Sequence, residues 1–144
     1  MPKIIIAYNN SHNIESHNFF QLCADCIKQS CVDNKYDYTS LMPPELTEEK
    51  IMENILTHKF CFIAAHGDVD GVYNENNEDV ISTRTTNYAF KEKCFYSVAC
   101  HCAKNLKDEL MRIGINLFVG YENEYRIGYN DTVFADCAME GAKQ

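Results

Sequence analysis

The sequence predicts an α/β fold, a three-layer sandwich in which helices flank a mostly parallel sheet of about five strands. Short apolar runs alternate with segments of helical periodicity along most of the chain. The first run, residues 3–8, is continuous and β-branched, as expected of a strand buried on both faces. Right-handed crossovers then bring the carboxyl ends of all strands to one edge of the sheet, which is where such folds bind their ligands.

The predicted elements follow one another as strand, helix, strand, helix, strand, hairpin, strand, helix, strand and helix. Single residues predict two of the helix ends. Thr47 suits the N-cap of the second helix, and Gly114 suits the position directly after the third helix. The polar stretch before the fourth strand, with interleaved Val and Tyr residues, is typical of a hairpin. Strands are expected at residues 3–8, 35–42, 59–67, 93–100 and 115–121, helices at 14–30, 43–58, 103–114 and 130–144, and the hairpin at 68–92.

Length and charge limit the function classes. The 144 residues predict one domain, 1–144, and the formal net charge of −8 argues against direct binding of nucleic acid or of an anionic membrane. No segment is long enough to span a bilayer, and the first apolar run is too short for a signal peptide. The expected compartment is therefore the cytoplasm, where the eight cysteines remain thiols.

Two kinds of bound group are disfavoured. Residues 8–16, after the first strand, contain no glycine, which argues against a nucleotide site of the Rossmann or flavodoxin type. Cys23, Cys26 and Cys31 suggest a metal site at first, but the first two lie within a predicted helix and no second ligand pair has suitable spacing. They are expected to pack in the core, so the sequence predicts no metal and no cofactor.

His66 and Cys100 each follow an apolar run, and the two runs are consecutive predicted strands. Consecutive strands are usually neighbours, so an imidazole and a thiol are expected at the same edge of the sheet. An imidazole can deprotonate a nearby thiol, and the N–H of Gly67 can approach a substrate oxygen closely. This set suits acyl transfer, with Cys102 as the less favoured nucleophile. The alternative to this catalytic interpretation is that His66 is a surface histidine and Cys100 a cysteine packed in the core.

Three stretches resemble the clan of caspase-like cysteine peptidases. "FIAAHG", residues 62–67, is similar to the strand that ends in the catalytic His-Gly, and "FYSVAC", residues 95–100, to the strand that ends in Ala-Cys with the nucleophile. Residues 106–125 resemble the helix and strand that follow, with a likeness to gingipains and to the CHAT domains associated with TPR repeats. The resemblance in strand order covers residues 3 to about 125 and implies a caspase-like sheet of flavodoxin order.

The resemblance implies a cysteine endopeptidase, a caspase-like hydrolase that cleaves protein or peptide substrates through a thioester acyl-enzyme. Cys100 would be the nucleophile, His66 the general base or acid, and Gly67 part of the oxyanion hole. Asp68 and Asp70 would either line the substrate cleft or be turn residues. Many clan members carry an acidic residue where this chain has Val98, so a preference for basic substrate residues does not follow.

The alternative function is a catalytically inactive caspase-like scaffold, or a regulatory subunit, that binds a partner protein in a signalling or defence assembly. The chain is shorter than most domains of the clan. A minimal domain, a truncated form of a larger protein and a subunit whose pocket a partner completes are three interpretations of that length.

Overall fold

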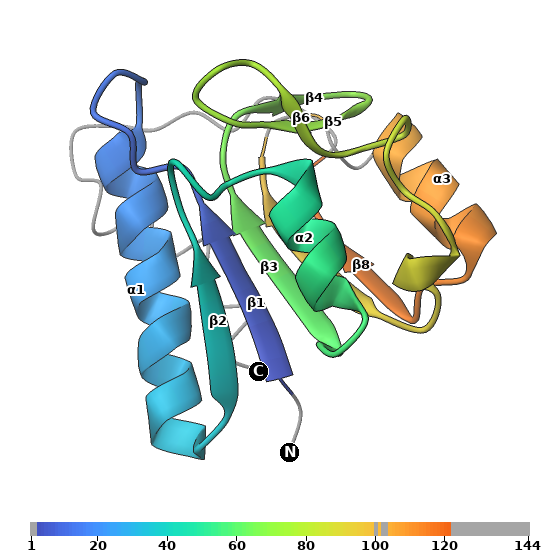
Figure 1. The fold of residues 1–144 in the computed structure, drawn as a ribbon, viewed down its shortest axis with the longest axis horizontal. Coiled ribbons are helices and arrows are strands. Elements are labelled where there is room, and N and C mark those ends of the chain that lie inside the picture. Colours follow the sequence, from blue (N-terminus) through green and yellow to red (C-terminus); the bar gives the residue numbers. More distant parts are fainter. Residues whose placement is uncertain (1–2, 100, 102–103, 122–144) are drawn as a thin grey trace.

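The computed structural model describes residues 3–99, 101 and 104–121. Within them, five parallel strands in the order β2-β1-β3-β7-β8 form a central sheet (Figure 1). This is the flavodoxin strand order, so the predicted fold class is confirmed. The strands are β1 (Lys3–Tyr8), β2 (Asp37–Leu41), β3 (Phe60–Ala64), β7 (Cys94–Val98) and β8 (Leu117–Val119).

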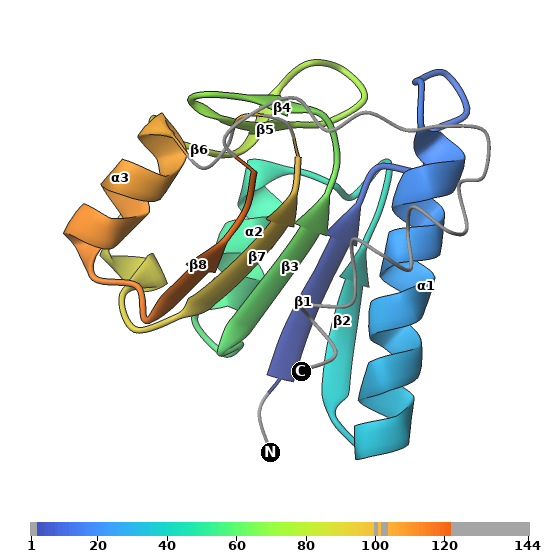
Figure 2. The ribbon, with the colours of Figure 1, turned by 180° about the vertical axis from the view of Figure 1, so that it is seen from behind.

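Helices cover both faces of the sheet and complete the three layers (Figures 1 and 2). Because successive strand residues point to opposite faces, Ile6 and Phe62 pack with one apolar cluster, and Ile5 and Ile63 with the other. The first cluster contains the apolar side of α1 (His17–Asn34). The second contains residues of α2 (Glu48–Ile55), of the 3₁₀ turn η1 (Tyr88–Phe90) and of α3 (Asn105–Ile113).

The predicted hairpin is a small antiparallel sheet at the carboxyl ends of the central strands (Figure 1). Its strands are β4 (Gly67–Asp68), β5 (Gly71–Tyr73) and β6 (Asp79–Ser82). Val72 and Ile81 are fully buried in the cluster that also contains α2 and α3. The amide of Leu106 donates to the Val69 carbonyl at 3.0 Å, which ties the start of α3 to the loop between β4 and β5.

Two helix ends lie where their cap residues predict them. Thr47 accepts a hydrogen bond from the Lys50 amide at 3.2 Å, and Gly114 ends α3 with a φ of 106°, so both predicted caps are confirmed. The first helix begins later than predicted because Ser16 is left-handed, and it continues to Asn34. The predicted helix at 130–144 lies outside the described residues. No described helix has both the length and the apolar composition that crossing a membrane requires.

His58, which precedes β3, is buried as a neutral ring. Nδ1 donates to the Asn54 carbonyl at 2.7 Å, so Nε2 accepts the Thr39 hydroxyl proton at 2.8 Å. Burial is the largest cause that lowers the pKa of His58, with Lys3 and Lys93 adding to it and the Asn54 carbonyl opposing it. Burial makes the charged ring unfavourable, so the fold favours the neutral form.

We expect the chain to lose stability in mild acid through His58. A histidine in the unfolded chain has a pKa of about 6.5, and the folded value is lower. The unfolded state therefore binds the proton more readily, and stability is full above pH 6.5 and falls as the pH drops from there toward the folded pKa. Urea unfolding at a series of pH values measures this. His58→Gln should flatten the pH dependence of stability. The same substitution at the exposed His12 should leave that dependence unchanged. If the pH dependence of His58→Gln equals that of the wild type, His58 is not its cause.

Candidate functional site at the carboxyl edge

The two strands that end in the predicted site residues are neighbours. β3 pairs with β7 in parallel register, with Ala64 opposite Val98, and the Ala65 amide donates to the Val98 carbonyl at 3.2 Å. His66 follows Ala64 by two residues, as Cys100 follows Val98 in the sequence. The predicted adjacency of the strands is confirmed, whereas Cys100 and Cys102 lie outside the described residues.

His66 connects two loops at the carboxyl edge. Its Nε2 lies 2.8 Å from the main-chain oxygen of Glu15, in the loop between β1 and α1. A carbonyl oxygen only accepts, so Nε2 carries a proton and donates it. The ring also meets Phe20 of α1 edge to face, with centroids 5.1 Å apart. β2 lies on one side of β1 and β3 on the other, so the strand order reverses between β1 and β3. The bond joins the loops that follow these two strands, at the topological switch point of the sheet.

Asp68 and Asp70 make the contacts of turn residues. The Asp68 carboxylate accepts from the Asp70 amide at 2.8 Å, from the Gly71 amide at 3.2 Å and from the Tyr73 hydroxyl at 2.6 Å. Asp70 accepts from the Asn105 side chain of α3 at 2.9 Å. These bonds favour the turn interpretation over a substrate cleft. Burial, followed by the hydrogen bond with Asp68, raises the pKa of Tyr73 to about 12.

Gly67, the third predicted member, begins β4 directly after His66. It pairs with Val72 of β5 in antiparallel register, and the Tyr73 amide donates to the His66 carbonyl at 2.9 Å. Gly67 thus belongs to the small sheet while its neighbour His66 is held by the loop after β1. His66 and Gly67 lie at the carboxyl edge of the central sheet, and their predicted roles in catalysis stay predictions.

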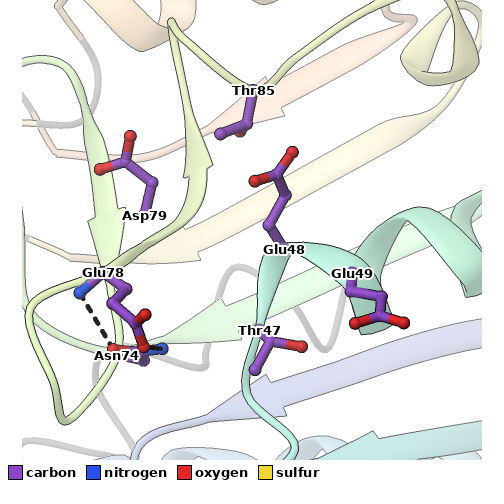
Figure 3. A pocket seen from close by; sticks show the side chains of 7 residues that line it. All are labelled: Thr47, Glu48, Glu49, Asn74, Glu78, Asp79 and Thr85. Carbon is purple, nitrogen blue, oxygen red and sulfur yellow. Dashed lines mark hydrogen bonds between the residues drawn. The ribbon is translucent and has the colours of Figure 1, made fainter.

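Sequence reasoning missed an acidic hollow between α2 and the hairpin (Figure 3). The hollow measures about 300 Å³, and Glu48 from α2 faces Glu78 and Asp79 from the hairpin across it. Arg84 binds Asp79 at 2.8 and 3.1 Å and, as the largest cause, lowers the pKa of that carboxyl. The lining residues are Thr47, Glu48, Glu49, Asn74, Glu78, Asp79 and Thr85.

The other carboxylates of the hollow form no ion pair with the residues that the structure describes. Within residues 3–99, 101 and 104–121, no ion pair involves Glu48, Glu49 or Glu78. Glu78 accepts a hydrogen bond from the Asn74 side-chain amide at 3.3 Å, and Asn74 also donates to the Leu46 carbonyl at 3.1 Å. The hollow therefore has a rigid floor and a net negative lining.

Three of the described thiols are buried in the core, whereas Cys26 and Cys94 are half-buried. Cys23 and Cys31 are buried on the apolar side of α1, which confirms their predicted packing role, and Cys61 is buried in β3. Burial raises the pKa of both Cys23 and Cys61 to about 12, and it also raises the pKa of Cys31. Among the described residues no three His, Cys, Asp or Glu side chains are grouped so that they could hold a metal ion.

The comparisons with known proteins concern the fold. No family model and no curated protein matches the chain. An oxidoreductase structure from Corynebacterium diphtheriae is 10% identical, with a TM-score of 0.59 over 99% of this chain and 93% of the other. A flavodoxin from the domain Archaea is 8% identical, with a TM-score of 0.48 over 94% and 92%. The fold is flavodoxin-like.

The predicted enzyme class, a caspase-like cysteine protease, is corrected at this point. A solved structure with a TM-score of 0.59 over 99% of this chain is described as an oxidoreductase and not as a peptidase. The resemblance to the caspase-like clan stays a prediction made from the sequence.

Proposed function

We propose that the chain is a regulatory or scaffold domain that binds a basic partner protein at the carboxyl edge of its sheet. The observation that carries this proposal is the acidic hollow, in which, among the described residues, only Asp79 of four carboxylates is paired with a cation. Lysine or arginine side chains of a partner would supply the missing positive charge. The carboxyl edge of the sheet is also where open α/β folds bind their ligands.

The surroundings of the hollow suit a fixed recognition surface. Thr47 holds the start of α2, and the Asn74 side-chain oxygen accepts the amides of Asn76 and Glu78 at 2.9 and 3.0 Å. Carboxylates on such a support lose little conformational entropy when a partner binds. The described cysteines are free thiols, which supports the cytoplasm as the compartment.

A redox role has less support in this chain. The oxidoreductase description belongs to a structure that is 10% identical. Residues 8–16 contain no glycine with which a main chain could approach a cofactor phosphate closely. The buried thiols Cys23, Cys31 and Cys61 have raised pKa values and are poor nucleophiles.

We expect fluorescein-labelled hexalysine to bind the chain and labelled hexaglutamate not to bind. The double variant Glu48→Gln/Glu78→Gln removes one charge from each side of the hollow while keeping the side-chain shapes. Because each lost ion pair costs up to about 1 kcal/mol, the dissociation constant should rise about tenfold. Fluorescence anisotropy at low and at physiological salt measures both the affinity and its screening.

The matched control is Asp25→Asn/Asp33→Asn, which removes the same charge from exposed positions of α1. Its affinity for hexalysine should stay within about twofold of the wild type. An equal loss in both double variants would assign the binding to net charge alone and would contradict the proposal. Absence of salt-sensitive binding in the wild-type chain would contradict it as well.

A further inference from the structure

Met42 lies directly after β2 with two hydrogen-bond donors on its sulfur. The Tyr8 hydroxyl is 3.4 Å from the sulfur, and the side-chain amide nitrogen of Asn10 is 3.7 Å from it. Thioethers are weak acceptors, so the convergence of two good donors on one is unusual. Met42 as a residue is also 36% exposed, so small solutes reach its side chain.

The donors are oriented by their other partners. Lys28 of α1 donates to the Tyr8 oxygen at 2.6 Å, which leaves the single hydroxyl proton of Tyr8 free to point at Met42. One amide hydrogen of Asn10 goes to Gln21 at 2.9 Å, and the second is available to the sulfur. A charged donor such as Lys28 also makes the tyrosine hydroxyl a stronger donor.

We propose that Met42 is a site of oxidation to methionine sulfoxide, and that Tyr8 and Asn10 donate hydrogen bonds to the new oxygen. Hydrogen peroxide is the oxidant: the sulfur gains one oxygen atom and loses two electrons, and the peroxide is reduced to water. A sulfoxide oxygen accepts hydrogen bonds far better than a thioether does, so the existing donors hold the oxidised form more firmly. The oxidised residue then ties the loop after β2 to the end of β1 and to α1.

The test compares Met42 with Met111, an exposed methionine of α3 at 53% exposure, for whose sulfur the described residues provide no donor. Wild-type protein is treated with dilute hydrogen peroxide, and peptide mass spectrometry gives the sulfoxide fraction at each methionine. We expect Met42 to reach full conversion along with Met111. If Met42 remains a thioether when Met111 is fully oxidised, the proposal is overturned.

The second measurement is the melting temperature in a Met111→Leu background. Oxidation should raise Tm by about 2–4 °C when both donors are present, and should lower it when Asn10→Ala or Tyr8→Phe removes one. Met42→Leu should show no shift on oxidation. If the oxidised chain that keeps both donors has a Tm equal to or lower than that of the unoxidised chain, the proposal is overturned. Asn10 is only half-buried, so its variant preserves the comparison if the Tyr8 variant does not fold.

Discussion

Gly71→Ala is expected to lower the free energy of unfolding by about 2–3 kcal/mol. A Cβ atom at Gly71 would lie 2.5 Å from both the Ile81 carbonyl oxygen and the Ser82 Cβ, and 2.6 Å from the Ser82 Cα. Two of these atoms belong to the backbone of β6 and cannot rotate away, so β5 and β6 have to separate. Urea unfolding measures the loss, and the affinity for hexalysine should fall with it because the hairpin forms one side of the hollow.

Gly114→Ala provides the comparison at a second glycine. There a Cβ would meet only the Lys91 side chain, at an ordinary 3.6 Å, but the φ of 106° strains any residue with a side chain. The expected cost is about 1 kcal/mol, with no effect on the hollow. If Gly71→Ala is no less stable than Gly114→Ala, the close approach of β5 to β6 is not as the structure describes it.

Phe62→Ala is expected to have the largest effect on stability, a loss of about 4 kcal/mol. Phe62 is fully buried in the central strand β3, and its ring stacks on Tyr96 with centroids 5.8 Å apart. Neighbouring strands on both sides prevent the cavity from collapsing. Thermal melts and urea unfolding measure the change.

Phe60→Ala is the matched control for Phe62→Ala. Phe60 lies on the same strand and packs against the same cluster, but it is half-buried. Solvent already reaches its ring, so its removal should cost roughly half as much. Equal losses at the two positions would show that the face of β3 toward α1 is less tightly covered than the burial of Phe62 indicates.

The fold could be predicted because its signals are local. A β-branched run predicts a buried strand, Thr47 begins a helix and Gly114 ends one, and each signal depends on a few adjacent residues. The alternation of strands and helices then predicts a parallel sheet with right-handed crossovers, whereas the strand order was implied only by the family resemblance. The late start of α1 could not be predicted, because the left-handed conformation of Ser16 has no sequence signal comparable to glycine.

The candidate site was predictable only in part. The position of His66 follows from the end of an apolar run, but its partner is a main-chain oxygen 51 residues earlier, which any residue type could provide. The hollow combines the start of α2 with residues 74–85 of the hairpin, and neither segment alone indicates a pocket. Short motifs resemble many families, which is why they suggested an enzyme class that the fold comparison does not support.

The bond between His66 and the Glu15 carbonyl makes two loops mechanically dependent on each other. Residues 9–16 follow β1, and residues 65–67 follow β3, so neither loop can swing outward without breaking that contact. Local opening at the switch point is therefore cooperative, and the free energy for moving either loop includes that of the other. If the imidazole were displaced, the Glu15 carbonyl would lose this donor unless an N–H or O–H group of another molecule replaced it.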